Sequence, residues 1–532
     1  MSHQITLCFI LTLALLITAC GPSVVATPDD RISPTPTVMP TLTESAPLPT
    51  ATPLPTATST VVVQELPEST LFDVDWEDRA LFREGVIPAA QDVLDELAGA
   101  SVYHMDLEIA GDYRSLTGRE EVLYTNQEEV ELGEIYFRLF PNLLGGEVII
   151  ENLTVNDAAV EPEYELENSA LLVPLPEGIE PGEQVVIGLD FQVKVPMTPE
   201  GNYGSFIFRD DVLALAHFYP MIPVYDEDEG WNVEIPAESG DIVFADSSFY
   251  VVEVTAPSDA VLAGSGIVIE RESAGNKQTL TFAAGPMRDF YLVASEEYEV
   301  VSTEVGETTI NSYAFPFQNR IAEEVLETTA DAIQIFNERI GPYPYTEFDI
   351  APTPNQALGI EYPGIVVITD RLYNAANSGV LESTIAHEVG HQWFYNVVGN
   401  DQLDEPWVDE ALVQYITYLY FLEQYGSAGA SGFYQSLQER WQRVGEADIP
   451  IGLPVAAYSP ERYGAIVYGR GPLFFDMLAA EIGEEAFNEF LREYYQTNLF
   501  GIGTGAEIKE VAEKACDCDL TPLWEEWVYE EM

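Results

Sequence analysis

The chain has 532 residues, 47% of them hydrophobic, and its 90 acidic residues against 21 basic ones give a formal net charge of −69. This length and hydrophobic content allow more than one buried core, and 11% aromatic residues argue against an acidic disordered protein. The scarcity of positive charge excludes a nucleic-acid-binding surface, and the acidity indicates a solvated, salt-adapted surface, with bound calcium as the alternative.

The chain begins with an apolar run, MSHQITLCFILTLALLITACGPS, which ends in small residues and leads at once into proline-rich sequence. The run is too short for an ordinary membrane-spanning helix. Its end, LITAC, resembles a bacterial lipobox, in which the cysteine becomes the lipidated first residue of the mature protein. The resemblance implies a signal peptide over residues 1–20, a lipid anchor on Cys20 and an extracytoplasmic, membrane-anchored protein. Because no Lys or Arg precedes the apolar stretch, an uncleaved anchor is the alternative.

Residues 21–67 are rich in proline, threonine and alanine and show no hydrophobic periodicity. This composition predicts an extended linker that holds the folded body away from the membrane. Residues 68–100 then contain short helical patterns, interrupted at Gly85 and Pro88.

The hydrophobic pattern changes twice after residue 100. Apolar and polar residues alternate in segments such as QVVIGLDFQVKV and SFYVVEVTAP, which predicts an antiparallel β domain over residues 101–312. Helical patterns dominate residues 313–532, with a few strands such as EFDIAPTP and GIVVIT. The sequence thus predicts an α+β multidomain protein.

Two cysteines remain in the C-terminal part, Cys516 and Cys518. A C-x-C pair alone is a weak metal signal and a strained candidate for a disulfide. We interpret the pair as two small residues near the end of a helix.

The segment TIAHEVGHQW places two of the chain's five histidines four residues apart, with a glutamate directly after the first. A helix is expected over residues 381–398, with Asn377 or Ser378 as its N-cap. His387 and His391 then lie one turn apart on one face, so both imidazoles can reach a single ion. Glu388 lies beside them, where it can take a proton from a water molecule, but a catalytic zinc needs a third protein ligand.

Glu410 stands near the start of the next predicted helix, in WVDEA, and eighteen residues separate it from the second histidine. This pattern, H-E-x-x-H followed by eighteen residues and then a glutamate, resembles the motif of the gluzincin aminopeptidases. That family includes aminopeptidase N and leukotriene A hydrolase. The resemblance implies one Zn²⁺ per chain, held by His387, His391 and Glu410, with Glu388 as the general base.

Two further segments carry the resemblance. LGIEYPGIVVIT is similar to the family's G-x-M-E-N strand, which implies backbone contacts to the substrate from Gly359 and Ile360 and a carboxylate, Glu361, for the substrate's amino group. The chain departs from that pattern with Ile360 in place of Met and Tyr362 in place of Asn. IVYGRGPLFFDML is similar to the family's Y-x-K-G segment, which implies Tyr468 as the phenol that stabilises the oxyanion.

Three positions around these motifs leave alternatives. Tyr463 is a second candidate phenol, although the spacing to Gly471 favours Tyr468. Arg470 takes the family's Lys position, with an ordinary solvated charge as the alternative. Thr417 stands where the family often has an acid, seven residues after its third ligand.

The resemblance covers about residues 101–532. It implies a saddle-like antiparallel β domain followed by a mostly helical, thermolysin-like zinc peptidase domain with a small sheet. Because the large helical domain that usually covers the family's active site has no counterpart in this sequence, we expect a more open site. We predict a zinc aminopeptidase that acts on N-terminal residues of peptides, with a zinc endopeptidase on the same scaffold, or a non-catalytic surface-binding lipoprotein, as alternatives.

Overall fold

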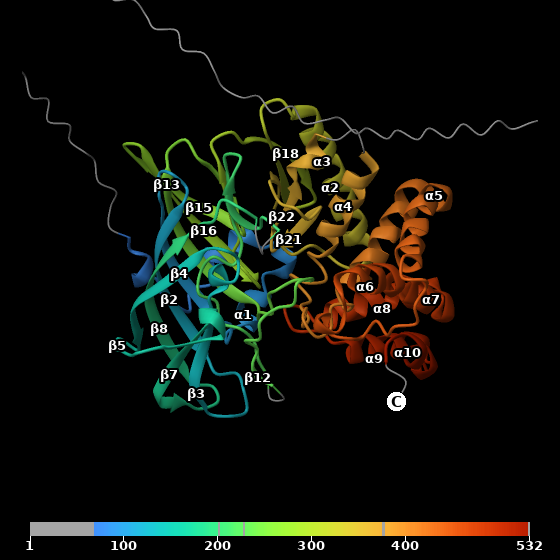
Figure 1. Cartoon of the computed structure of the whole chain (residues 1–532), viewed down its shortest axis with the longest axis horizontal. Coiled ribbons are helices and arrows are strands. Elements are labelled where there is room, and N and C mark those ends of the chain that lie inside the picture. Colours follow the sequence, from blue (N-terminus) through green and yellow to red (C-terminus); the bar gives the residue numbers. More distant parts are fainter. Residues whose placement is uncertain (1–68, 200–202, 227–228, 375–377, 530–532) are drawn as a thin grey trace, which may run out of the picture. The chain divides into compact units, whose positions relative to one another are not determined.

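The computed structural model describes residues 69–199, 203–226, 229–374 and 378–529, which all belong to one compact unit (Figure 1). The predicted signal peptide, the lipid anchor Cys20, the linker over 21–67 and the predicted N-cap Asn377 lie outside these residues. Within the described ranges, no helix is both long enough and apolar enough to span a bilayer. The predicted fold class, strands first and helices after, is confirmed.

From residue 69 onward, four short helical turns precede the first strand that the structure describes: η1 (Leu71–Asp73), η2 (Ala80–Gly85), η3 (Pro88–Ala90) and α1 (Val93–Glu96). Pro88 occupies the first turn of η3, where its missing N–H leaves no helical hydrogen bond unmade. Leu71 and Phe82 are buried in the main hydrophobic core, so these turns pack against the body of the protein.

The largest sheet has eight strands in the order β15-β16-β13-β1-β2-β8-β4-β5. Their bounds are β1 (Val102–Ile109), β2 (Ser115–Thr125), β4 (Glu147–Val155), β5 (Ala158–Ala159), β8 (Gln184–Lys194), β13 (Ser248–Pro257), β15 (Ile267–Ala274) and β16 (Lys277–Met287). Every second residue of β8 from Val185 to Val193 is buried, as period-two alternation predicts. One pair departs from the antiparallel prediction: β1 and β13 run parallel, because the chain leaves this sheet and returns to it much later.

Smaller sheets complete the first half. A three-stranded sheet has the order β3-β7-β6 and a four-stranded sheet the order β14-β17-β10-β9, and β11 pairs with β12. Their bounds are β3 (Leu132–Arg138), β6 (Glu163–Glu165), β7 (Ala170–Ile179), β9 (Phe206–Arg209), β10 (Val212–Leu215), β11 (Tyr225–Asp226), β12 (Gly230–Trp231), β14 (Val261–Gly264) and β17 (Leu292–Ser295), with the short helical turns η4 (Phe140–Asn142) and η5 (Leu166–Asn168) between strands.

The sheet of the second half has five strands in the order β18-β19-β20-β22-β21. The bounds are β18 (Glu299–Val305), β19 (Thr308–Ala314), β20 (Glu347–Thr353), β21 (Gly359–Tyr362) and β22 (Ile365–Thr369). β19 pairs with β20, so the predicted domain boundary after residue 312 falls inside a strand of this sheet, which begins at residue 299. Alternation identifies a strand but not the sheet that it joins, so the sequence pattern does not show that β18 and β19 continue into this sheet.

The helices of the second half lie together in Figure 1, from α2 in yellow to α10 in red. They are α2 (Asn319–Arg339), α3 (Asp370–Tyr373), α4 (Ser378–Gly390), α5 (Glu410–Gln442), α6 (Pro460–Ala465), α7 (Gly471–Ile482), α8 (Glu484–Thr497), α9 (Gly505–Cys516) and α10 (Thr521–Trp527), with the 3₁₀ turn η6 (Val455–Ala457) and the π-helical turn η7 (Ile466–Arg470).

Helix α4 is shorter than predicted. It ends at Gly390 rather than at residue 398, and the chain turns immediately afterwards. The buried residues Trp393, Phe394, Val397 and Val398 lie in those turns, so the apolar pattern continues where the helix does not. The two histidines are still one helical turn apart, because the backbone N–H of His391 donates to the carbonyl of His387 at 3.3 Å.

Cys516 and Cys518 form a disulfide at the C-terminal end of α9, with their Cα atoms 5.2 Å apart. Our interpretation of two unlinked small residues is therefore wrong. Asp517, between them, adopts the left-handed conformation (φ 50°, ψ 45°), which the spacing of the cysteines does not reveal.

Arg288 fastens the turns after α4 to the rest of the protein. This buried side chain follows β16, and its guanidinium donates to the carbonyl of Tyr395 at 2.7 Å and to that of Val397 at 3.3 Å. It also donates to the carbonyls of Ala245 at 3.0 Å and Gly501 at 2.5 Å. One side chain from the first half thus holds the segment that follows the second histidine.

Replacing Arg288 with Met should destabilise the protein by about 3 kcal/mol, because four backbone carbonyls lose a charged donor. The midpoint of thermal unfolding should fall by several degrees, whereas Arg320→Met, at an exposed position of α2, should leave it nearly unchanged. Equal midpoints for the two variants would show that Arg288 does not fasten this segment.

Candidate metal centre and active site

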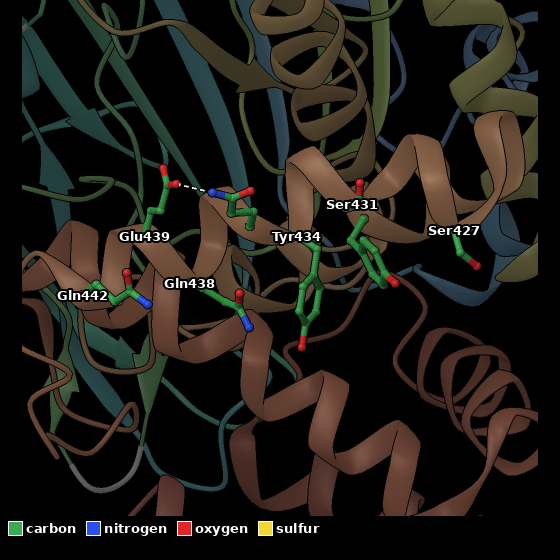
Figure 2. Close-up of a pocket in the computed structure, with 8 residues that line it drawn as sticks. Ser427, Ser431, Tyr434, Gln438, Glu439 and Gln442 are labelled. Carbon is green, nitrogen blue, oxygen red and sulfur yellow. Dashed lines mark hydrogen bonds between the residues drawn. The ribbon is translucent and has the colours of Figure 1, made fainter. Parts of the chain in front are cut away.

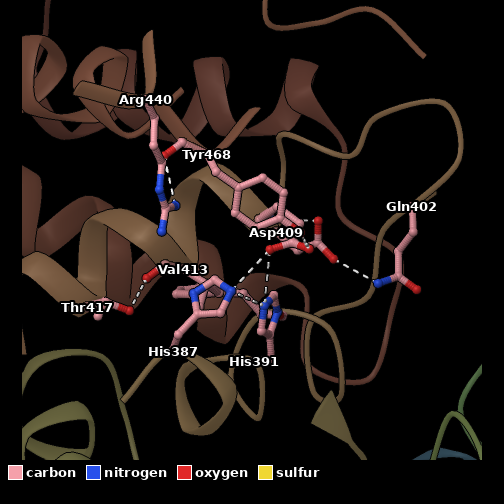
Figure 3. A network of polar contacts seen from close by, with 10 residues as sticks. His387, His391, Gln402, Asp409, Val413, Thr417, Arg440 and Tyr468 are labelled. Carbon is pink, nitrogen blue, oxygen red and sulfur yellow. Dashed lines mark hydrogen bonds and ion pairs between the residues drawn. The ribbon is translucent and has the colours of Figure 1, made fainter. Parts of the chain in front are cut away.

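Three side chains converge on one point (Figure 3): His387 from the last turn of α4, His391 from the turn directly after it, and Glu410 from the start of α5. The Nε2 atoms of His387 and His391 lie 3.3 Å apart, and Oε2 of Glu410 lies 3.3 Å and 3.4 Å from them. Four ligands about 2.0–2.1 Å from a tetrahedral zinc are separated from one another by roughly 3.3–3.5 Å. The spacing of the three atoms therefore fits Zn²⁺, and among the described residues this is the one group of three or more possible ligands with such spacing.

An unsatisfied atom supports the same fit. Oε2 of Glu410, which faces both imidazoles, is buried and has no hydrogen-bond partner in the protein. Nδ1 of His391 lies 3.1 Å from the carbonyl oxygen of Phe394, so its N–H donates there and its Nε2 lone pair faces the group. A buried carboxylate oxygen that faces two imidazole nitrogens is stabilised by a cation among them.

The electrostatics of the group are those of a cation site. Burial lowers the pKa of His387 to about 4, which keeps this imidazole in the neutral, ligating form. Burial raises the pKa of Glu410, but the two imidazoles outweigh burial and hold this pKa well below its ordinary value. Burial lowers the pKa of His391, yet the carboxylates of Glu361 and Glu410 raise it to about 10, because the surroundings of this imidazole are strongly negative.

Residues before α5 position the third ligand. The carboxylate of Asp409 caps α5 by accepting from the backbone N–H of Glu410 at 2.7 Å. Gln402 donates to the other oxygen of Asp409 at 3.0 Å (Figure 3). Thr417 bonds to its own helix, at the carbonyl of Val413 (2.7 Å), and gives no support to the histidines.

β21 lies at the edge of the five-stranded sheet and passes beside Glu388, the residue that follows His387. A Cβ at Gly359 would lie 2.5 Å from Oε1 of Glu388, so a glycine allows the strand to come this close. Ile360 follows in the strand, and Glu361 is buried at 7% exposure. Burial, and then the charge of Asp241, raise the pKa of Glu361 well above its ordinary value, whereas His391 opposes them.

Glu388 is also buried, at 4% exposure. Burial raises its pKa well above the ordinary value, and the charges of Glu410 and Asp241 add to the effect. The structure therefore collects carboxyl groups of like charge around the two histidines, a grouping that favours a bound cation.

Tyr468 reaches the group from η7. Its hydroxyl donates a hydrogen bond to Oε1 of Glu410, and its ring centroid lies 6.1 Å from that of His387. Tyr463 packs edge-on against the Tyr468 ring at 5.6 Å and makes no hydrogen bond to Glu410 or the histidines. Of the two candidate phenols, the structure brings Tyr468 to the group.

Arg470 is neither part of the group nor a solvated charge. The side chain is 3% exposed and donates to Oδ1 of Asp448 at 2.7 Å and to the carbonyls of Ile449 and Glu526. It ties η7 to the C-terminal part of the chain, and the sequence did not reveal this because those partners are far from it along the chain.

Sequence reasoning missed Asp241, which lies in the loop between β12 and β13. Burial raises its pKa well above the ordinary value, and the charges of Glu410 and Asp409 raise it further, because its carboxyl lies beside the third ligand. The sequence contains no signal that distinguishes this residue from the other 89 acidic ones.

A hollow of about 490 Å³ runs along α5, away from the candidate zinc ligands (Figure 2). Its lining is polar: Tyr418, Ser427, Ser431, Tyr434, Gln435, Gln438, Glu439 and Gln442. Gln435 donates to Glu439 across it at 2.6 Å. The hollow contains none of the predicted site residues.

Comparisons with known proteins agree with this geometry. Residues 324–527 match the family model described as Peptidase family M1 domain. Aminopeptidase 2 of Candida albicans is 25% identical over 269 residues, which are 48% of this chain and 29% of that protein. Aminopeptidase M1 of Arabidopsis thaliana is 23% identical over 295 residues, 52% of this chain and 33% of that protein. The matched region is therefore about a third of the length of these relatives.

Solved structures share the fold. The M1 zinc metallopeptidase of Deinococcus radiodurans superposes with a TM-score of 0.61 at 18% identity, covering 81% of this chain and 94% of that chain. A mutant of that enzyme bound to a Tyr-Ser-Ala substrate gives a TM-score of 0.59 at 19% identity, over 81% of this chain and 93% of that chain. Both halves of the chain thus have the fold of a two-domain M1 metallopeptidase.

Replacing Glu410 with Gln should weaken zinc binding by more than about a hundredfold. Even the loss of a residue that only hydrogen-bonds to a metal ligand lowers metal affinity by about ten- to a hundredfold, and the loss of the ligand itself should cost more. Competition with a chromophoric chelator measures this affinity. The matched control is Glu439→Gln, an exposed position on the same helix, which should bind zinc as tightly as the native protein. An unchanged affinity in Glu410→Gln would exclude it as a ligand.

Proposed function

We propose that the protein is a zinc-dependent aminopeptidase, which removes N-terminal residues from peptides, and we start from the match of residues 324–527 to the Peptidase family M1 domain. One observation carries the proposal. A group with tetrahedral spacing, His387, His391 and Glu410, lies beside two further buried carboxyl groups, Glu388 and Glu361. The first of these can move a proton and the second can hold an amine. The names of the curated relatives, which are aminopeptidases, support the same activity.

His387, His391 and Glu410 would hold a zinc ion, which would supply Lewis-acid chemistry toward a peptide carbonyl and a water molecule. Glu388 accepts the proton of the attacking water and passes it to the leaving amine. In this structure the hydroxyl of Tyr468 donates a hydrogen bond to Glu410. During the reaction the same hydroxyl donates to the carbonyl oxygen of the substrate and stabilises the negative charge that develops there.

The edge strand β21 positions the peptide. Its free edge can pair with an extended substrate through the backbone of Gly359 and Ile360. Glu361, the next residue of the strand, then pairs with the protonated α-amine and places the first peptide bond beside the zinc-binding group. A peptide without a free amine leaves this buried carboxylate unpaired, which disfavours internal cleavage.

Glu361→Gln should lower kcat/KM by roughly thirty- to a thousandfold on peptides with a free N-terminus, because about 2–4 kcal/mol of transition-state binding is lost with the charged pair. The measurement compares a free peptide with its N-acetylated form on the native protein and on the variant. Equal cleavage of both forms by the native protein would replace this proposal with the endopeptidase alternative. Glu423→Gln, at an exposed position of α5, is the control for a lost carboxylate.

We also propose that a lipid on Cys20 anchors the mature protein to a membrane, with the active site facing away from the cytoplasm. The lipobox-like LITAC and the Pro/Thr-rich linker over residues 21–67 support this location.

Cys20→Ser should release the protein from membranes while its specific activity stays unchanged, because the linker separates the anchor from the site. The measurement is the fraction of protein that remains with membranes after an alkaline wash. Retention of the variant would favour an uncleaved N-terminal anchor instead.

A further inference from the structure

Glu120 is a carboxyl side chain inside the β domain, far along the chain from the zinc-binding group. It lies on β2 at 0% exposure, and neither of its oxygens has a hydrogen-bond partner in the described part of the chain. Both oxygens are closed off from solvent, so water cannot replace the missing partners. The group is therefore buried without the bonds that ordinarily accompany a buried carboxyl.

The neighbours of Glu120 in the sheet are apolar. β2 lies between β1 and β8, and Glu120 is paired with Met105 on one side and with Leu189 on the other. Val122, two residues further along β2, lies on the same face of the sheet. None of these three side chains is more than 3% exposed, so hydrocarbon flanks the carboxyl on both neighbouring strands and on its own.

No cation in the described ranges compensates the carboxyl. Burial alone raises the pKa of Glu120 well above its ordinary value. Its charge acts on two phenols, Tyr103 of β1 and Tyr250 of β13: burial raises the pKa of both, and a charge on Glu120 raises it further. His104 and Glu121 belong to the opposite face of the sheet, because side chains alternate along a strand, and they cannot pair with Glu120.

We propose that Glu120 makes the fold of the β domain depend on a bound proton, so that the protein is most stable in mildly acidic surroundings and unfolds more readily as the pH rises. The folded chain accepts the neutral acid at the cost of an unpaired O–H, but an ionised carboxylate without a partner is far more costly there. In the unfolded chain the same carboxyl reaches water and ionises freely. Release of a proton therefore accompanies unfolding.

The direction of the pH dependence follows from the protons bound in each state. Above the ordinary pKa of 4.5, the unfolded chain has released the proton that the folded chain keeps. The equilibrium constant for unfolding then rises by about tenfold per pH unit from this group alone, until the pH passes the raised pKa of the folded state. The surface acts in the same direction, since the carboxylates behind the net charge of −69 repel one another less when they gain protons.

Opening of the β domain would also affect the zinc-binding group. Arg288, directly after β16 of the same sheet, holds the turns that follow His391. The inference does not rest on the proposed function, however, because it concerns the equilibrium between folded and unfolded chain and not turnover.

The experiment measures urea unfolding of the full-length protein between about pH 5 and pH 7. Glu120→Gln keeps the shape of the side chain and cannot ionise, and Glu120→Met replaces the carboxyl with an apolar group. The ratio of the native to the variant unfolding constant is taken at each pH, so that all other titrating groups cancel. This ratio should rise by about tenfold per pH unit for both variants. For Glu272→Gln, at an exposed position of β15 in the same sheet, it should stay constant.

Infrared spectroscopy reads the carboxyl in the folded protein and needs no reversible unfolding. With isotope-labelled glutamate, the spectrum of the native protein minus that of Glu120→Gln at about pH 7 should contain the C=O band of a protonated acid. Glu120→Met serves in the same way if the Gln variant does not fold. Subtracting Glu272→Gln should instead leave a carboxylate band. A carboxylate band for Glu120, or an unfolding ratio that does not change with pH, overturns the inference.

Discussion

The carboxylate of Glu410 between two imidazole nitrogens, at 3.3 and 3.4 Å, is the interaction around which the second half of the chain is arranged. A buried carboxylate is costly unless its charge is matched, and neutral imidazoles match it only when a cation joins them. Asp409 orients the backbone of Glu410, and Tyr468 bonds its second oxygen. The candidate zinc ligands and the proposed catalytic tyrosine thus belong to one hydrogen-bonded structure.

The first half of the chain takes part in this arrangement. Arg288, at the end of β16, holds the turns that follow His391, and Asp241 brings another carboxyl beside Glu410. The β domain therefore contributes to the position of a ligand and to the charge of the site. Catalysis by the helical half alone is not expected to equal that of the whole protein.

The sequence predicted what local periodicity and spacing determine. Two histidines one helical turn apart, and a glutamate at the start of the next helix, were enough to identify the zinc-binding group, and alternation identified the β domain. The sequence did not predict features that depend on contacts between segments far apart in the chain. Helix α4 ends at Gly390, which lies close against Val413 of α5, and Arg288 holds the turns that follow; the left-handed Asp517 lies between Cys516 and Cys518, which form a disulfide. Such contacts leave no periodic signal along the chain.

The central claim is that Glu388 transfers the proton in a reaction for which the zinc-binding group supplies the metal. The most direct measurement is the turnover of a zinc-replete Glu388→Gln protein, with metal content determined on the same sample. The account predicts one zinc per chain and a kcat lower by about 10²–10⁴-fold, because general acid–base catalysis is lost while His387, His391 and Glu410 remain. Native turnover in a variant that contains a full equivalent of zinc would contradict it.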